Sequence, residues 1–271
     1  MDIKRITSIL LGFPLVVLIL TLGNNYIVDI CLVFIAMLGM QEYFNAVSKD
    51  SKPVRWLGYV ACLFIALIHI VPTYLPSWTI SNILALGIPT IMLILFAQVI
   101  FTNMKTTFKD IAYTFFGMAY VIGSITFIAL LRGLDNGRIL IWYAIIAAWG
   151  TDTFAYLIGI KFGKHKLNKI SPKKSVEGAI AGTISAVILG VLYTLAINEW
   201  YNFEYSYIYI SIAIVILSVI GQIGDFAASS IKRYVDVKDY SNLIPGHGGM
   251  LDRIDSLMFL APFAYVIFSM L

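Results

Sequence analysis

Charged residues are scarce in this chain. Asp, Glu, Lys and Arg make up 13% of its 271 residues, about half the share found in soluble domains. Hydrophobic residues make up 60%, and the mean hydropathy is +0.87. These values exclude an ordinary soluble enzyme and a disordered protein, and they are typical of an integral membrane protein.

Cysteine and histidine are also scarce, with two and three residues. Cys31 and Cys62 lie in apolar runs without CxxC spacing or a neighbouring histidine, so we interpret them as core residues. His69 falls inside an apolar run, and His165 falls in a basic segment. This pattern favours neither a disulfide scaffold nor a zinc site, and the net charge of +4 is too small to indicate nucleic-acid binding.

Nine apolar runs have about the length that a helix needs to cross a bilayer core. They cover residues 6–22, 27–45, 57–75, 80–101, 111–131, 139–158, 176–197, 207–226 and 257–271. The first run follows a basic N-terminus as in a signal peptide, but no small-residue cleavage site comes after it, so we expect a retained span. The sequence predicts an all-α, polytopic helical membrane protein with about nine transmembrane helices.

The positions of Lys and Arg predict how these helices are oriented. Seventeen of the nineteen fall at the N-terminus or in alternate connections, and only Arg132 and Arg138 fall on the other side. The positive-inside rule then places the N-terminus in the cytoplasm and the C-terminus outside. We expect an N-terminal transmembrane region, 1–138, and a catalytic region, 139–271, whose long loops 159–175 and 227–256 are cytoplasmic.

Acidic residues gather at the predicted cytoplasmic boundary. Ionisable groups at membrane depth are costly and mark functional sites. Four aspartates lie at or near this depth: Asp152, Asp225, Asp252 and Asp255. Glu42 and Glu177 lie at the same boundary, and for them a role as helix caps or ion-pair partners is equally open. Asp29, near the outer side, is interpreted as structural.

The spacing of these residues suits a phosphate and metal site. Asp225, Ser229 and Lys232 are spaced i, i+4 and i+7, so a helix that continues beyond residue 226 presents them on one face. Asp252 and Asp255, spaced i and i+3, also share a helix face. Carboxylate oxygens are ligands of Mg²⁺, which usually takes one or two of them together with substrate phosphates.

Two segments have the composition of anion-binding loops. The sequence Pro-Gly-His-Gly-Gly at 245–249 holds three glycines, which let backbone amides approach an anion closely. The segment KFGKHKLNKISPKKS at 161–175 holds six lysines. These lysines indicate attraction to anionic lipids, binding of a polyphosphate or lipid headgroup, or both.

The segment SSIKRYVDVKDYSNLIPGHGGMLDRIDS at 229–256 resembles the signature of phosphatidate cytidylyltransferases, also called CDP-diacylglycerol synthases. The matching positions are Ser229, Lys232, Arg233, Lys238, Ser241, His247, Gly248, Gly249, Asp252, Arg253 and Asp255. A second stretch is also similar to the family, at Asp152, Gly159, Lys164, Ser171, Lys173, Lys174 and Glu177. Ser175 stands where threonine is more usual, which keeps the hydroxyl. The resemblance covers roughly residues 149–260.

This resemblance implies an enzyme that joins CTP and phosphatidic acid, with CDP-diacylglycerol and pyrophosphate as products. It implies a requirement for Mg²⁺, with a second cation as a further option. It also implies a homodimer in the plasma membrane, whose polar pocket opens to the cytoplasm and the inner leaflet. Membrane lipid is the expected surrounding, and no nucleic-acid partner is expected.

Under this implication the candidate residues take separate roles. Metal binding falls to Asp225 and Asp252, with Asp152 and Asp255 as further candidates. Phosphate charge would be balanced by Lys232, Arg233, Lys238 and Arg253. Phosphates would be cradled by Ser229 and by the turn with His247, Gly248 and Gly249, and either substrate would be contacted by Ser171, Lys173 and Lys174.

Two other functions stay open from the sequence. A CTP-dependent lipid kinase would use similar residues but would transfer the γ-phosphate instead of the cytidylyl group. A transporter could use Asp152 and Asp225, although its charges would more naturally lie at the midplane of inverted repeats, and no clear repeat is found.

Overall fold

The computed structural model describes residues 3–74, 80–168, 171–172, 174–201, 203–244, 246 and 248–271, and the regular elements in these ranges are all helical. This confirms the predicted all-α class. The chain forms two compact units. The first comprises Met1–Gly133 and Val235–Arg253, and the second comprises Leu134–Tyr234 and Ile254–Leu271. The functional division at residue 138 stays a prediction.

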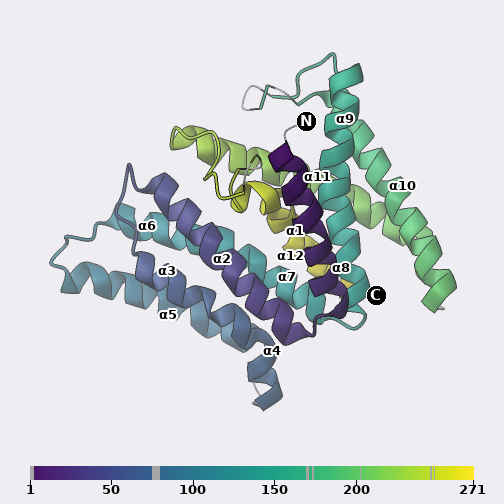
Figure 1. Ribbon diagram of the computed structural model, residues 1–271. Helices are drawn as coiled ribbons and strands as arrows, with labels where there is room; N and C mark the ends of the chain where they lie inside the picture. The colour runs from purple at the N-terminus through teal and green to yellow at the C-terminus, as the bar shows by residue number, and fades with distance from the viewer. Residues whose placement is uncertain are drawn as a thin grey trace. The chain divides into compact units, whose positions relative to one another are not determined.

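The first unit is built around one long helix. Its elements are α1 (Ile3–Leu22), α2 (Asn25–Val47), α3 (Arg55–Cys62), α4 (Phe64–Tyr74), α5 (Ile80–Phe101), α6 (Phe108–Gly117), the π-helical η1 (Met118–Gly123) and α7 (Ser124–Gly133). α2 contacts α3, α4, α6 and α7, and Figure 1 shows it lying among them. Buried Met40 and Phe44 of α2 pack closely on Gly58 of α3, where a side chain would not fit.

Polar side chains that this unit buries among apolar helices have partners. The Nδ1 atom of His69 lies 2.7 Å from the Oδ2 atom of buried Asp29. The guanidinium of buried Arg132 donates to Asn25 Oδ1 at 3.0 Å and to the carbonyl oxygen of Gly23 at 2.9 Å. Because a buried polar group is costly unless it is hydrogen-bonded, these contacts stabilise the fold and give Asp29 and His69 a structural role.

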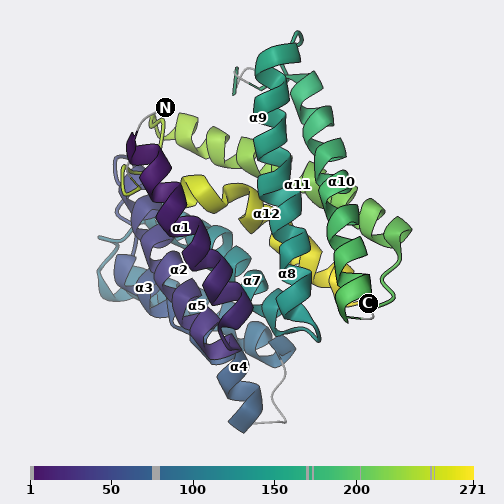
Figure 2. The same cartoon turned by 45° about the vertical axis from the view of Figure 1, so that its right-hand side comes forward.

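The second unit consists of longer helices. Its elements are α8 (Gly137–Ile145), the π-helical η2 (Ile146–Gly150), α9 (Thr151–Phe162), α10 (Val176–Tyr201) and α11 (Tyr207–Tyr234), with most of α12 (Leu251–Phe268). α9 and α10 lie side by side in both views (Figures 1 and 2). Gly178 and Gly182 allow this close packing, since a Cβ atom on either would lie 2.6 Å from a carbonyl oxygen of α9.

Five helical stretches are long and apolar enough to cross a membrane. They are Asn25–Val47, Phe108–Gly133, Gly137–Phe162, Val176–Tyr201 and Tyr207–Tyr234. Each of the nine apolar runs predicted from the sequence overlaps a helical segment. The polytopic helical membrane class is therefore confirmed, while the number nine and the orientation stay predictions.

Candidate active site

Three of the predicted aspartates lie in the second unit, each on a different helix. Asp152 is in the first turn of α9, Asp225 is on α11 and Asp255 is on α12. Ser256 links two of them: its Oγ atom donates to Asp152 Oδ2 at 2.8 Å and lies 3.5 Å from Asp255 Oδ1. The backbone amide of Ser256 also donates to Asp255 Oδ1 at 2.8 Å. We call Asp152, Asp225, Asp255 and Ser256 the acidic cluster.

The acidic cluster concentrates negative charge in a region of low solvent exposure. Asp255 lies before the apolar run 257–271, and burial raises the pKa of its carboxyl to about 7. The charges of Asp225 and Asp152 act in the same direction, and the charge of Lys232 opposes them. Like charges that share a buried site favour the binding of a compensating cation.

Two lysines supply positive charge to the acidic cluster. The Nζ atom of Lys174 forms an ion pair with Asp225 Oδ2 and also lies 4.9 Å from the ring centroid of Phe226. Lys232 is buried on α11. The helix continues beyond residue 226 to Tyr234. Asp225, Ser229 and Lys232 therefore lie on one face, as the sequence predicted for a continuous helix. Lysines next to carboxylates can neutralise the phosphates of a substrate.

A chain of hydroxyl groups lies in the same unit. Ser218 Oγ is 2.7 Å from Thr151 Oγ1 and 2.8 Å from Thr183 Oγ1. The side-chain amide of Gln222 donates to Thr183 Oγ1 at 3.0 Å. Thr151 directly precedes Asp152 and follows the π-helical η2, and π-helical turns are frequent at functional sites. These contacts join α9, α10 and α11 next to Asp152 of the acidic cluster.

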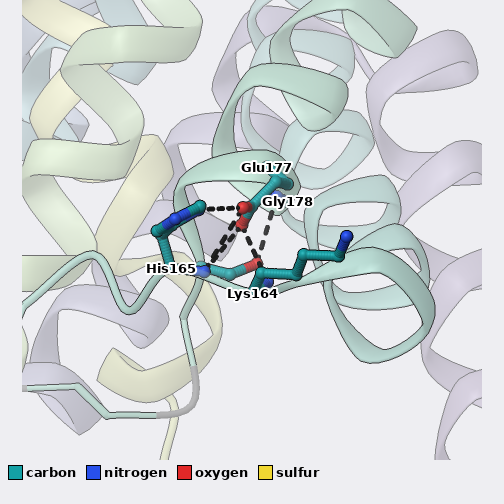
Figure 3. A network of polar contacts seen from close by, with 5 residues as sticks. Lys164, His165, Glu177 and Gly178 are labelled. Carbon is teal, nitrogen blue, oxygen red and sulfur yellow. Dashed lines mark hydrogen bonds and ion pairs between the residues drawn. The ribbon is translucent and has the colours of Figure 1, made fainter.

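The basic loop 163–175 is closed at its base by Glu177 (Figure 3). The Glu177 carboxylate accepts hydrogen bonds from the backbone amides of Lys164 and His165, at 3.1 and 3.2 Å, and its Oε1 atom lies 2.6 Å from His165 Nδ1. The loop is further paired by hydrogen bonds from Leu167 N to Lys174 O and from Val176 N to His165 O, both 2.9 Å. Glu177 thereby fixes the start of the loop, and Lys174 lies near the other end of the same loop.

The glycine-rich turn belongs to the first unit. Gly246 and Gly248 have φ values of 77° and 82°, which L-residues rarely adopt, and the amide of Ile244 donates to the carbonyl oxygen of Gly248 at 2.9 Å. The Oδ2 atom of Asp252 accepts hydrogen bonds from the amides of Tyr240 at 2.9 Å and Gly249 at 3.0 Å. Asp252 therefore holds both ends of the segment 240–249.

Glu42 holds the same segment from a helix about two hundred residues earlier in the chain. Its carboxylate is buried and accepts hydrogen bonds from Met250 N and Leu251 N, both at 2.8 Å, and from Ser241 Oγ at 2.6 Å. A Cβ atom at Gly249 would lie 2.7 Å from both carboxylate oxygens, so a larger residue there would displace the Glu42 carboxylate. The sequence left open whether Glu42 belongs to a functional site or serves as a helix cap or ion-pair partner. In the structure its carboxylate caps the start of α12.

The other predicted site residues are placed as follows. Arg233, Lys238 and Arg253 are exposed, Ser229 is half-buried, and Ser171 forms a turn by accepting a hydrogen bond from Lys174 N on its carbonyl oxygen. Lys173 and His247 lie outside the described residues. Sequence reasoning gave no role to Ser256, although it directly follows Asp255 in the family-like segment, and no local signal connects Glu42 to the turn.

The acidic cluster suits Mg²⁺ by donor type. Its carboxylate oxygens and net negative charge match a hard cation, and Asp152 and Asp255 are already linked through one hydroxyl. In the part of the chain that the structure describes, no three His, Cys, Asp or Glu side chains come close enough together to hold a metal ion. Mg²⁺ is usually held by one or two carboxylates plus substrate phosphates, and Asp152 and Asp255 can supply these carboxylates.

Helices that can cross a membrane, with a partly buried group of acids and lysines, define a membrane enzyme acting on phosphate-bearing substrates. The model of the cytidylyltransferase family matches residues 3–271, so the chain belongs to that family. Three relatives are named phosphatidate cytidylyltransferase. Those of Staphylococcus haemolyticus and Staphylococcus saprophyticus are 31% and 32% identical over 97% of this chain and 96% of their own. That of Bacillus subtilis is 36% identical over 66% of each chain.

Proposed function

We propose that this protein transfers the cytidylyl group of CTP to phosphatidate, forming CDP-diacylglycerol and pyrophosphate in phospholipid synthesis. The observation that carries the proposal is the acidic cluster with Lys174 and Lys232, built on the helices of a chain that belongs to the cytidylyltransferase family. The shared name of the relatives supports cytidylyl transfer, and it lends no support to a lipid kinase or a transporter.

The reaction needs little acid–base chemistry from the protein. An oxygen of the phosphatidate phosphate attacks the α-phosphorus of CTP, and the bond from that phosphorus to the oxygen bridging to the β-phosphate breaks, releasing pyrophosphate. A phosphate monoester has a second pKa of about 6, so at neutral pH it is already a nucleophile. Catalysis then consists of holding two anions in line and neutralising the charge that develops.

The lysines and acids of the second unit can perform this task. Lys174 is paired with Asp225 in the structure. We propose that an incoming phosphate competes for Lys174, which frees the Asp225 carboxylate for a cation while the ammonium contacts the phosphate. Lys232 supplies further positive charge beside Asp255. Mg²⁺, held by Asp225 with Asp152 or Asp255, would polarise the phosphate oxygens and neutralise their charge.

Other parts of the sequence prediction remain part of this proposal. Asp252 is still a predicted metal ligand, and its bonds to the turn fix the carboxylate's orientation. Arg233, Lys238, Arg253 and the glycine-rich turn remain predicted phosphate contacts. A homodimer, the plasma membrane and a site facing the cytoplasm are likewise predictions, supported by the distribution of Lys and Arg along the chain.

One assay separates cytidylyl transfer from phosphoryl transfer. Purified protein is incubated with phosphatidate, Mg²⁺ and CTP labelled in the cytidine ring, beside CTP labelled in the γ-phosphate. We expect cytidine label in the lipid product, γ-label in released pyrophosphate, and no product after EDTA treatment. Lipid that carries the γ-label without cytidine would instead identify a lipid kinase.

The predicted side of the basic loop can be tested separately. Cysteine is placed at exposed Lys166 or at exposed Arg138 in a chain whose Cys31 and Cys62 are replaced by serine. We expect an impermeant thiol reagent to label the position-138 variant in intact cells and the position-166 variant only after lysis. Labelling at position 166 in intact cells would overturn the topology without affecting the proposed reaction.

A further inference from the structure

A second polar site lies entirely in the first unit, in a surface pocket of about 440 Å³. Its walls come from the end of α2 with the connection to α3, and from the connection between α5 and α6 with the first turn of α6. Four lysines line it: Lys49, Lys52, Lys105 and Lys109. Two aspartates also line the pocket, so its net charge is positive.

Asp110, one of these aspartates, builds the pocket instead of opposing an anion. Its buried carboxylate accepts a hydrogen bond on Oδ1 from the amide of Lys52 at 2.5 Å. Its Oδ2 atom accepts from the amide and the hydroxyl of Thr107, both at 2.8 Å. Asp110 thereby ties the two connections together, and three donors surround its negative charge. The side chains of the four lysines are exposed, so positive charge dominates the open side of the pocket.

Large apolar side chains alternate with these lysines along the chain. Phe101, Met104 and Phe108 are each more than 70% exposed, and they flank Lys105 and Lys109 in sequence. Phe108 is the first residue of a helical stretch that can span a membrane. These apolar side chains therefore lie at one end of that span, at the boundary between membrane and water. Exposed aromatic residues beside ammonium groups at such a boundary match an amphiphilic ligand with a phosphate head and an acyl tail.

We propose that this pocket binds the headgroup of an anionic phospholipid from the surrounding leaflet, with its acyl chains along Phe101, Met104 and Phe108. Lys52 and Lys105, one from each connection, contact the phosphate. A free phosphate ion shares the charge of this ligand but lacks the apolar part. The proposal uses only residues of the first unit, so it stands independently of the proposed catalytic role of the acidic cluster.

Native mass spectrometry of the full-length protein in detergent tests the proposal. The protein is titrated with phosphatidylglycerol, as wild type, as the Lys52→Gln/Lys105→Gln double variant, and as Arg138→Gln, which changes an exposed basic residue outside the pocket and outside the segment 161–175. We expect wild type and R138Q to retain one lipid that the double variant binds at least about tenfold more weakly. Phosphatidylcholine is expected not to occupy this position.

Two further arms separate a lipid from a free anion. Phosphate at a concentration in large excess over the lipid should not displace it, and Phe108→Ser, which keeps all four lysines, should weaken lipid binding. Equal lipid binding by wild type and the double variant would overturn the proposal. Displacement by inorganic phosphate, or lipid binding unchanged by F108S, would overturn it as well, because the pocket would then be a simple anion site. Melting temperatures confirm that each variant is folded.

Discussion

Two pairs of carboxylates, one pair in each compact unit, are held by different kinds of donor. In the first unit, Glu42 and Asp252 accept hydrogen bonds mainly from backbone amides of the segment 240–251. In the second unit, Asp152 and Asp225 are held by the side chains of Ser256 and Lys174. A backbone amide cannot leave without unfolding the turn, whereas a side chain can rotate away. Acids of the first kind shape a loop, and acids of the second kind can exchange their partner for a substrate or an ion.

The kind of donor also predicts whether the loss of a carboxylate lowers the stability of the fold or the activity. Removing a carboxylate that is saturated with backbone donors leaves buried amides without acceptors, which costs about 1–3 kcal/mol. Removing a carboxylate from a group of like charges relieves repulsion and leaves the fold intact. The following variants are ordered by the size of the effect on cytidylyl transfer that this comparison predicts.

Asp225→Asn is expected to have the largest effect. It keeps the size of the side chain and removes the charge that Lys174 and a cation would share. The turnover number should fall at least about a hundredfold, the loss of several kcal/mol of transition-state stabilisation. The assay is transfer of labelled cytidine at saturating CTP and Mg²⁺, with exposed Asp135→Asn as the matched control. Turnover close to wild type in D225N would place Asp225 outside the catalytic group.

Glu42→Gln should act through the fold first. A glutamine places an amide group against the backbone donors of Met250 and Leu251, so we expect a lower melting temperature and a loss of stability of about 1–3 kcal/mol. Activity should fall in parallel because the glycine-rich turn loses its anchor. The matched control is exposed Glu204→Gln. An unchanged melting temperature with strongly reduced turnover would assign Glu42 to catalysis and would break the comparison.

Lys174→Ala should change substrate binding more than turnover. Lys174 is partly exposed, and a charge contact in such a place is worth up to about 1 kcal/mol, or roughly a fivefold change in an equilibrium constant. We expect KM for CTP or phosphatidate to rise by about this factor, with exposed Arg138→Ala unchanged. If KM and the turnover number both stay at wild-type values, the basic loop serves only to attract the membrane surface.

Glu177→Gln should have the smallest effect. The carboxylate fixes the loop through three donors, but His165 is largely exposed, and water can replace part of this network. We expect faster hydrogen exchange at the amides of Lys164 and His165, and a rise of KM no larger than that of the Lys174 variant. Unchanged exchange at both amides would show that other contacts close the loop.

The sequence predicts the helical framework well and the site only in part. Apolar runs define helices because every backbone group in a membrane must be paired internally, and this holds from α2 to α11. The spacing of Asp225, Ser229 and Lys232 is local, so it could be read directly. The contacts of Glu42 with Met250 and of Ser256 with Asp152 join residues far apart in the chain, which no spacing rule reveals.

The most direct test of the account is to measure both the turnover number and the melting temperature of the Asp255→Asn variant. Burial and neighbouring acids raise the pKa of Asp255 to about 7, so its negative charge reduces stability at pH 8, and asparagine removes that charge while it can still accept the bond from Ser256. At pH 8 we predict a melting temperature above that of wild type and a turnover number at least about tenfold lower. A lower melting temperature together with wild-type turnover would contradict the account, because the charge would then serve the fold and not the reaction.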